Sequence, residues 1–248
     1  MGQGKSKGSA LNGRVIEIFS SIQGEGLWVG RPQVFVRFHG CRLKCGYCDT
    51  PLTHQKITQA RIESPPYSRQ FQTRSLEFTA EDLTRAVAPF EIPSLALTGG
   101  EPLEQADFIR EWLSRLKGYE VLLETSGVET EALKKVIPWV DMVSLDLKIP
   151  TATGERGYWE EHDRFMTVAS QKRAYAKIVY DEKMTSEEKK RVLDLLQKHE
   201  NLTFVFQPVS PLQKRDLKKC LEIFSEFAHH DPHRVRLIPQ VHKFLGIL

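Results

Sequence analysis

The sequence has little cysteine, no long apolar run and almost no net charge. Four of its 248 residues are cysteines, three of them within eight residues, so the chain lacks the disulfide framework of a small secreted domain. No stretch of about 18 apolar residues is present, which excludes a membrane-spanning helix, and no signal peptide opens the chain. The net charge of +3 is too small to indicate nucleic acid as the main partner. We therefore expect a cytoplasmic protein without membrane or direct nucleic-acid contacts.

The composition is typical of a globular protein. Hydrophobic residues make up 40% of the chain and charged residues 27%, an ordinary balance, and the length suffices for a large core. One large domain or two small ones fit this length, and a barrel can use all of it. Residues 1–13 are rich in Gly, Ser and Lys, which indicates a flexible lead-in. We expect residues 14–248 to form a single domain.

Strand-like and helix-like segments alternate along most of the chain. Runs typical of strands cover residues 14–19, 33–38, 94–98, 120–125, 142–147, 175–180, 202–207 and 235–239. Two of the intervening helices begin with capping signals, Thr79 followed by Asp82 and Thr185 followed by Glu188. Repeated strand–helix units predict a parallel sheet with right-handed crossovers. Because the units are too few for an eight-fold barrel, we expect an α/β fold that is a partial, open (β/α) barrel.

Residues 51–77 interrupt this alternation. They contain two consecutive prolines and many Gln, Arg and Thr residues, so we expect a loop insertion there, next to the cysteines. Loops of this length are usually functional or disordered.

The cysteine cluster carries the strongest chemical signal. Cys41, Cys45 and Cys48 follow the spacing Cys-x-x-x-Cys-x-x-Cys, and thiolates are the ligands of iron–sulfur clusters and structural zinc. Three ligands from one loop leave one iron of a four-iron cluster open to substrate chemistry. A zinc site completed by His39 or His54 is the alternative that the spacing alone leaves open.

The fourth cysteine, Cys220, lies in a helix predicted over residues 212–228. It shares one face of that helix with Leu217, Leu221, Phe224 and Phe227. We therefore interpret Cys220 as a small buried hydrophobic residue rather than a fourth ligand.

Polar strings recur where the predicted strands end. They comprise residues 98–101, 124–127, 146–148, Gln207 and residues 240–242. Ligands of parallel α/β folds gather at the carboxyl ends of the strands, so this repetition predicts a binding site at one edge of the sheet.

These motifs resemble a known superfamily. Tyr47 before the last cysteine of the cluster, together with Thr98-Gly-Gly-Glu-Pro102 at a strand end, resembles the radical S-adenosylmethionine (SAM) superfamily and implies its type of partial barrel. More narrowly, the chain resembles the 7-carboxy-7-deazaguanine synthase family from Val15 to its end. The matching strings are Ser21-Ile-Gln-Gly-Glu-Gly26, Arg37, Cys48-Asp-Thr50, Glu124-Thr-Ser-Gly127, Gln207-Pro208 and Gln240-Val-His-Lys243.

The resemblance implies an activity. The family converts 6-carboxy-5,6,7,8-tetrahydropterin to 7-carboxy-7-deazaguanine with loss of ammonia, a step toward queuosine and other deazapurines. It uses a [4Fe–4S] cluster, SAM in a catalytic role, and Mg²⁺. Because the cofactors carry the radical chemistry, no side chain is expected to be a catalytic acid or base.

The resemblance also implies residue roles on the cofactor side. The cluster would be held by Cys41, Cys45 and Cys48. SAM would be bound by Tyr47, Gly99, Gly100, Glu101, Ser144, Asp146, Lys148, Lys177 and Gln207. Of these, Gly99 and Gly100 would let the backbone approach the methionine part, and Glu101 would accept from its ammonium group. Lys177 and Gln207 are weaker candidates, and an exposed Lys is usually just solvated.

On the substrate side, the resemblance implies a binding set and a metal ligand. The pterin would be contacted by Ile22, Gln23, Gly24, Arg37, Thr98, Glu124, His242 and the terminal carboxylate of Leu248. A guanidinium binds a carboxylate in bidentate fashion, so Arg37 would hold the substrate carboxylate. The hydroxyl of Thr50 would bind Mg²⁺, which prefers oxygen ligands.

Two alternative functions are compatible with the cysteine motif. A radical SAM activase would act on a protein partner, whereas a zinc-binding module would have no catalysis at all. The string at residues 22–24, Arg37 and His242 favour a small carboxylated substrate. We also expect an external electron donor, flavodoxin-like or similar, and by resemblance a homodimer.

Overall fold

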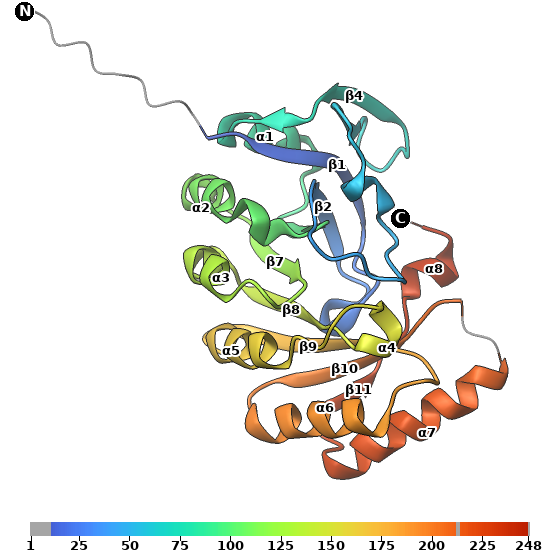
Figure 1. Cartoon of the computed structure of the whole chain (residues 1–248). Coiled ribbons are helices and arrows are strands. Elements are labelled where there is room, and N and C mark those ends of the chain that lie inside the picture. Colours follow the sequence, from blue (N-terminus) through green and yellow to red (C-terminus); the bar gives the residue numbers. More distant parts are fainter. Residues whose placement is uncertain (1–10, 212–213, 248) are drawn as a thin grey trace, which may run out of the picture.

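The computed structural model describes residues 11–211 and 214–247. Its centre is one curved sheet, with most of the helices packed along one side (Figure 1). The order across the sheet is β11-β10-β9-β8-β7-β6-β2-β1-β3-β4, and β5 (Glu77–Phe78) pairs with β1 off this path. In the described part of the chain, the outer strands β4 and β11 pair with no further strand. The sheet is therefore an open, partial barrel, as predicted.

Seven neighbouring strands are parallel, from β2 through β11. They are β2 (Pro32–Phe38), β6 (Ser94–Gly99), β7 (Glu120–Thr125), β8 (Met142–Leu147), β9 (Arg173–Tyr180), β10 (Thr203–Pro208) and β11 (Val235–Leu237). The first strand, β1 (Gly13–Ile22), runs antiparallel to β2. All eight predicted strands are present, and the bounds of β7 and β8 agree to the residue.

The helices lie between successive parallel strands, except for the last one, which follows β11. They are α1 (Ala80–Val87), α2 (Ala106–Arg115), α3 (Thr130–Val136), α4 (Pro150–Thr153), α5 (Trp159–Ala169), α6 (Ser186–Lys198), α7 (Lys214–His230) and α8 (Val241–Leu245). Capping boxes begin α1 at Thr79 and α6 at Thr185, as the sequence predicts. Within the described residues, no helix could span a lipid bilayer.

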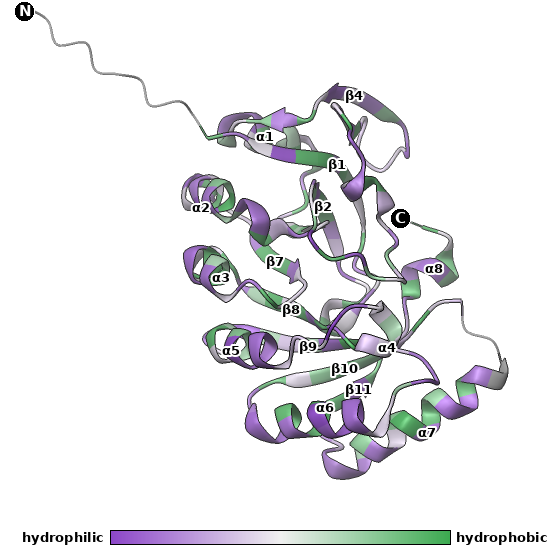
Figure 2. Cartoon of the chain, in the orientation of Figure 1, coloured by the Kyte–Doolittle hydropathy of each residue, from purple (hydrophilic) through white to green (hydrophobic). Residues whose placement is uncertain are grey.

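The sheet separates a large core from a small one. Alternate residues of β6 illustrate this: Leu95 and Leu97 belong to the large cluster, whereas Ala96 belongs to the small one. Side chains of a strand point alternately to its two faces, so the helix-covered face takes the large cluster. The parallel strands are mainly hydrophobic, while the helices carry both kinds of residue (Figure 2). Cys220 is fully buried in the large cluster, as predicted.

Residues 51–77 differ from the loop insertion that we expected. The segment holds strands β3 (Gln59–Glu63) and β4 (Phe71–Ser75), which form an antiparallel pair and extend the sheet beyond β1. The buried carboxylate of Glu63 accepts hydrogen bonds from the backbone N–H groups of Ser20 and Arg69. Glu63 thereby fixes the turn of this hairpin to β1.

Candidate active site

One cavity opens where the parallel strands end. It is bounded by the ends of β2 and β6 through β10, by the cysteine loop and by the chain around α8. Most of the predicted site residues line it together, although they come from segments spread over the whole sequence. These are Ile22, Gln23, Gly24, Arg37, Cys41, Cys45, Tyr47, Cys48, Thr50, Thr98, Gly99, Gly100, Glu124, Asp146, Lys148, Lys177, Gln207 and His242.

The cysteine loop is anchored through its backbone. The N–H groups of Arg42 and Lys44 donate to the carboxylates of Glu104 and Glu155, and Gly46 donates to the carbonyl of Thr153 at 2.7 Å. These contacts leave the thiols free: Cys41, Cys45 and Cys48 form no disulfide. The loop thus presents three thiols to one cavity.

Two buried lysines and two partly buried carboxylates form an ion network beside the thiols. It consists of Glu25, Asp146, Lys148 and Lys177. The ammonium of Lys177 pairs with Glu25 and lies 3.1 Å from Asp146, and that of Lys148 lies 2.9 Å from Asp146. Burial alone would raise the pKa of Asp146, but the two ammonium groups lower it. The network therefore stays ionised, and Lys177 is buried rather than solvated.

Glu124 lies next to this network in a different electrostatic setting. Burial raises the pKa of its carboxyl, and the nearby charge of Glu25 adds to this, against the opposing effect of Lys177. The side-chain amide of Gln23 donates to it at 2.8 Å and also to Gln33 at 3.0 Å. Glu124 is thereby held in place at the cavity wall.

Arg37 reaches the cavity from β2 and is oriented by its cross-strand neighbour. Its Nε lies 3.3 Å from a carboxylate oxygen of Glu17, the residue opposite it on β1. One terminal nitrogen donates to the hydroxyl of Thr50 at 3.3 Å, and the guanidinium lies over the ring of Phe19. The guanidinium of Arg37 is thus held in one orientation on the wall of the cavity.

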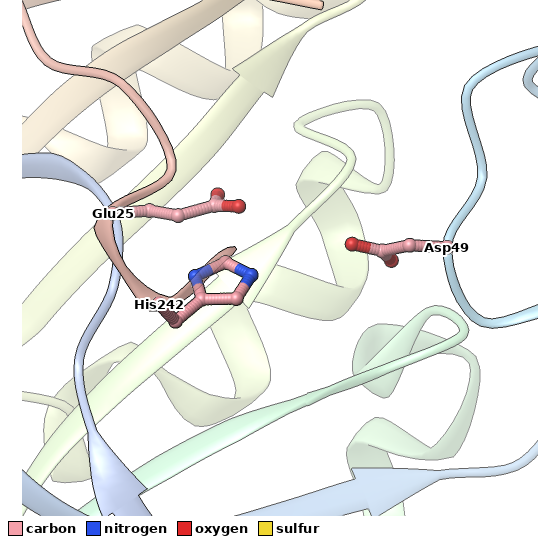
Figure 3. Close-up of side chains that lie close together, drawn as sticks. All are labelled: Glu25, Asp49 and His242. Atoms are coloured by element: carbon pink, nitrogen blue, oxygen red, sulfur yellow. The ribbon is translucent and has the colours of Figure 1, made fainter. Parts of the chain in front are cut away.

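Three possible metal ligands converge at the cavity mouth. Ligand atoms of Glu25, Asp49 and His242 all lie within 4.8 Å of one another, and the side chains point toward a common space (Figure 3). Both oxygens of Glu25 already accept hydrogen bonds, one from Lys177 and the other from Gln240. A cation bound by all three residues would have to compete with Lys177.

Comparisons with known proteins agree with this arrangement. The profile of the Radical SAM superfamily matches residues 35–206. A 7-carboxy-7-deazaguanine synthase of Geobacter sulfurreducens is 37% identical over 243 residues, covering 94% of this chain and 96% of the relative. Another, of Archaeoglobus fulgidus, is 34% identical over 248 residues, covering 96% and 100%. The chain belongs to the 7-carboxy-7-deazaguanine synthase family of radical SAM enzymes.

A solved structure supports the fold assignment. The crystal structure of QueE from Escherichia coli superposes with a TM-score of 0.66 at 20% identity and covers 93% of this chain and 95% of that one. Membership of the radical SAM family makes the chain an enzyme that uses a [4Fe–4S] cluster and SAM, and this synthase family also uses Mg²⁺.

The residues of the cavity fit these radical SAM cofactors. The three thiols supply the cysteine ligands that a [4Fe–4S] cluster needs. Burial raises the pKa of Cys41 to about 12 and also raises that of Cys45, which disfavours free thiolates and leaves these thiols to ionise on iron. The Oε1 of Gln207, a residue that lines the cavity, is buried without a hydrogen-bond partner in the described chain. Such an orphaned atom indicates a polar ligand.

Two members of the predicted SAM set lie outside the cavity. The carboxylate of Glu101 is buried and accepts from Leu103 N–H at 3.0 Å, Thr125 Oγ1 at 2.7 Å and Ser126 N–H at 2.7 Å. It lines a second, neighbouring cavity instead, where its role is to join the ends of β6 and β7. Ser144 is buried and hydrogen-bonds the hydroxyl of Tyr175. The predicted ligand Leu248 lies outside the described residues.

The two glycines of the predicted SAM motif are required by the fold itself. A Cβ at Gly100 would lie 1.9 Å from the carbonyl oxygen of Gly40, and one at Gly99 would lie 2.5 Å from the backbone nitrogen of Phe38. Gly99 also has a φ of +117°, which favours glycine. Close packing of β6 against the end of β2 therefore explains both glycines, and both still line the cavity.

Some residues of the cavity were not singled out from the sequence. Glu25, Asp49, Ser126 and Gln240 line it, and each lies inside a string that we quoted for the family resemblance. His162 lies just beneath the cavity and was missed altogether, because a lone histidine on a helix carries no sequence signal.

Proposed function

We propose that this protein converts 6-carboxy-5,6,7,8-tetrahydropterin to 7-carboxy-7-deazaguanine with loss of ammonia, using SAM catalytically. The observation that carries the proposal is that one cavity contains both the three thiols and a fixed cation, Arg37, suited to a substrate carboxylate. A flat, polar, carboxylated pterin matches this set of groups. The product serves the formation of queuosine or other deazapurines.

On the cofactor side, Cys41, Cys45 and Cys48 would hold the cluster. The backbone at Tyr47 and residues 99–100 would bind SAM together with Lys148 and Gln207. When bound and reduced, the cluster and SAM supply the radical chemistry. Burial would lower the pKa of the Lys148 ammonium, but Asp146, together with Tyr47 and Cys45, raises it, so Lys148 stays charged. A charged Lys148 suits the carboxylate of SAM.

On the substrate side, Arg37 would hold the pterin carboxylate. Glu17 occupies the Nε side of its guanidinium, and Thr50 accepts from one terminal nitrogen. Each terminal nitrogen has a second N–H group, so a bidentate pair with the substrate carboxylate remains available. Gln23 and Glu124 would pair with the polar edge of the ring. A raised pKa at Glu124 allows its carboxyl to carry a proton. His242, on α8, would contact the ring from the cavity mouth, with Ile22, Gly24, Thr98 and the Leu248 carboxylate completing the set.

Thr50 would bind Mg²⁺ at the cavity mouth. Its hydroxyl lies 3.3 Å from a carboxylate oxygen of Asp49, so two oxygen groups of the kind that Mg²⁺ prefers are adjacent. Substrate oxygens and water would complete the coordination. The ion would then join the substrate to the end of the cysteine loop.

An anaerobic assay tests the proposed reaction. Reconstituted protein is incubated with dithionite, SAM, Mg²⁺ and 6-carboxytetrahydropterin, and the products are followed by mass spectrometry. We expect 7-carboxy-7-deazaguanine to form. A protein that cleaves SAM and leaves the pterin unchanged would contradict the proposal and shift the search to a protein substrate.

We further propose the partners of the reaction. A radical SAM enzyme needs reductive activation, and a flavodoxin-like protein is the proposed donor. The enzyme is proposed to act as a homodimer. Three unoxidised thiols in one loop suit the reducing cytoplasm.

A further inference from the structure

A buried histidine joins two loops of the candidate SAM site from below. His162, on α5, is fully buried. Its Nε2 accepts from the backbone N–H of Lys148 at 3.1 Å, and its Nδ1 lies 3.0 Å from the carbonyl oxygen of Gly127. Because Nε2 accepts, the ring proton lies on Nδ1, which donates to Gly127. Both ring nitrogens are therefore bonded to backbone groups at neighbouring strand ends.

The surroundings of His162 favour this neutral form. Burial lowers the pKa of His162 to about 4, and the ammonium of Lys148 acts in the same direction. Glu161 and Asp146 act in the opposite direction. The ring of Tyr158 packs edge-on against the imidazole, with centroids 6.4 Å apart. At neutral pH, Nε2 therefore remains the acceptor from the Lys148 N–H, and Nδ1 remains the donor to the Gly127 carbonyl.

The two anchored backbone groups belong to loops that line the cavity. Gly127 follows Ser126, a residue that lines the cavity, and Lys148 directs its ammonium toward Asp146 and the ring of Tyr47. A Cβ at Gly127 would lie only 3.1 Å from His162 Nδ1, so the loop lies close against the imidazole. His162 itself does not line the cavity. It can act only through the residues that it holds.

We propose that His162 is a positioning residue for SAM: it fixes the Gly127 carbonyl and the Lys148 amide so that Ser126 and Lys148 face the cofactor. The proposal rests on the cofactor half of the proposed function and is independent of the pterin. A test on SAM binding alone therefore distinguishes its failure from failure of the proposed reaction.

The test uses three variants and a matched control, all in cluster-loaded protein without pterin. His162→Phe removes both hydrogen bonds, His162→Gln retains an acceptor near Nε2, and His162→Asn retains a donor near Nδ1. The control is His199→Gln, since His199 is also buried and bonds Asp163, beside His162, yet does not line the cavity. Calorimetry measures SAM affinity, and amide hydrogen exchange measures the protection of the Lys148 N–H.

We expect His162→Phe to weaken SAM binding at least tenfold and to speed exchange at Lys148. His162→Gln should restore protection at Lys148 and recover most of the affinity, whereas His162→Asn should leave that amide exchanging fast. His199→Gln should leave both readouts unchanged. Parent-like SAM affinity in His162→Phe, or an equal loss of affinity in His199→Gln, would overturn the proposal. If His162→Phe does not fold, His162→Gln and His162→Asn are compared instead. Equal SAM affinity and equal Lys148 protection in these two variants would then overturn the proposal.

Discussion

The ammonium of Lys177 lies 3.1 Å from a carboxylate oxygen of Asp146, its direct neighbour across the ladder between β9 and β8. The same ammonium pairs with Glu25, which follows β1. One buried cation thus links the strand ends on the cofactor side to the segment that carries Gln23 and Gly24. The cofactor and substrate halves of the cavity share this ion network.

Removing Lys177 should destabilise the fold strongly. The variant Lys177→Met leaves Glu25 and Asp146 with a single buried cation, Lys148, and a broken buried pair costs about 3–5 kcal/mol. Urea denaturation measures the loss, and the surface variant Lys189→Met, which loses an exposed pair with Glu226, should cost no more than about 1 kcal/mol.

The partner variant gives a second check on the same pair. Adding Glu25→Gln to Lys177→Met should cost less than the sum of the two single changes, because Glu25 is no longer a charge without its cation. Strict additivity, within about 0.5 kcal/mol, would show that the two residues are not coupled.

The cysteines should separate into two groups by iron content. Replacing Cys45 by Ala should abolish the brown colour and the iron of reconstituted protein, because the cluster loses one of three ligands. Cys220→Ala should keep full iron content and only lower stability by about 1 kcal/mol, since its thiol is a small buried group in α7. Iron loss in Cys220→Ala, or zinc in place of iron in the parent, would contradict the assigned ligand set.

Thr50 should control the response to Mg²⁺. Thr50→Ala removes the proposed oxygen ligand and should abolish stimulation of turnover by Mg²⁺, whereas Thr50→Ser keeps a hydroxyl and should retain it. Initial rates measured over a Mg²⁺ titration give the comparison. Equal stimulation in the parent and in Thr50→Ala would refute the assignment.

Arg37 should determine pterin affinity. Arg37→Lys loses the bidentate fork and should raise KM for the pterin by about 10-fold or more, an effect of about 1.4 kcal/mol. Glu17→Gln should give a smaller rise, because Glu17 only orients the guanidinium. The control is Arg61→Lys, which also pairs with Glu17 but does not line the cavity; a rise there equal to that of Arg37→Lys would count against direct binding.

His162 should make the fold sensitive to acid. Its pKa is lowered from 6.5 to about 4 by burial, so below pH 6.5 the unfolded chain gains a proton that the folded protein does not. The stability due to the neutral ring is present above pH 6.5 and falls, by about 3 kcal/mol, as the pH drops toward 4. His162→Gln should therefore show a shallower loss of unfolding free energy over this range, and parallel pH profiles would contradict the buried neutral state.

The sequence predicts much of the fold because the parallel strands are buried on both faces. In β8, from Met142 to Leu147, every position except Asp146 is buried, and apolar residues mark both ends of that strand. In contrast, β4 was missed because all but its first residue are exposed, and its place depends on backbone pairing with β3. The hydrophobic periodicity of a sequence does not predict a strand that lacks an apolar face.

The sequence predicts those site residues that lie in polar segments at the ends of predicted strands. The sequence indicates only a weak ligand at Lys177, because the two carboxylates around its ammonium are brought there by the tertiary fold. Glu101 was expected to meet the cofactor, yet three donors from the ends of neighbouring strands surround it. His162 depends on α5 packing beneath two loops, which no local pattern encodes.

The proposed reaction is a radical SAM conversion of a pterin in which SAM is regenerated. Its stoichiometry is measured by counting molecules of 7-carboxy-7-deazaguanine formed per molecule of SAM consumed, in the anaerobic assay with dithionite and Mg²⁺. We expect many products per SAM and little accumulation of 5′-deoxyadenosine. One 5′-deoxyadenosine released per turnover, or SAM cleavage with the pterin intact, would refute the proposed reaction.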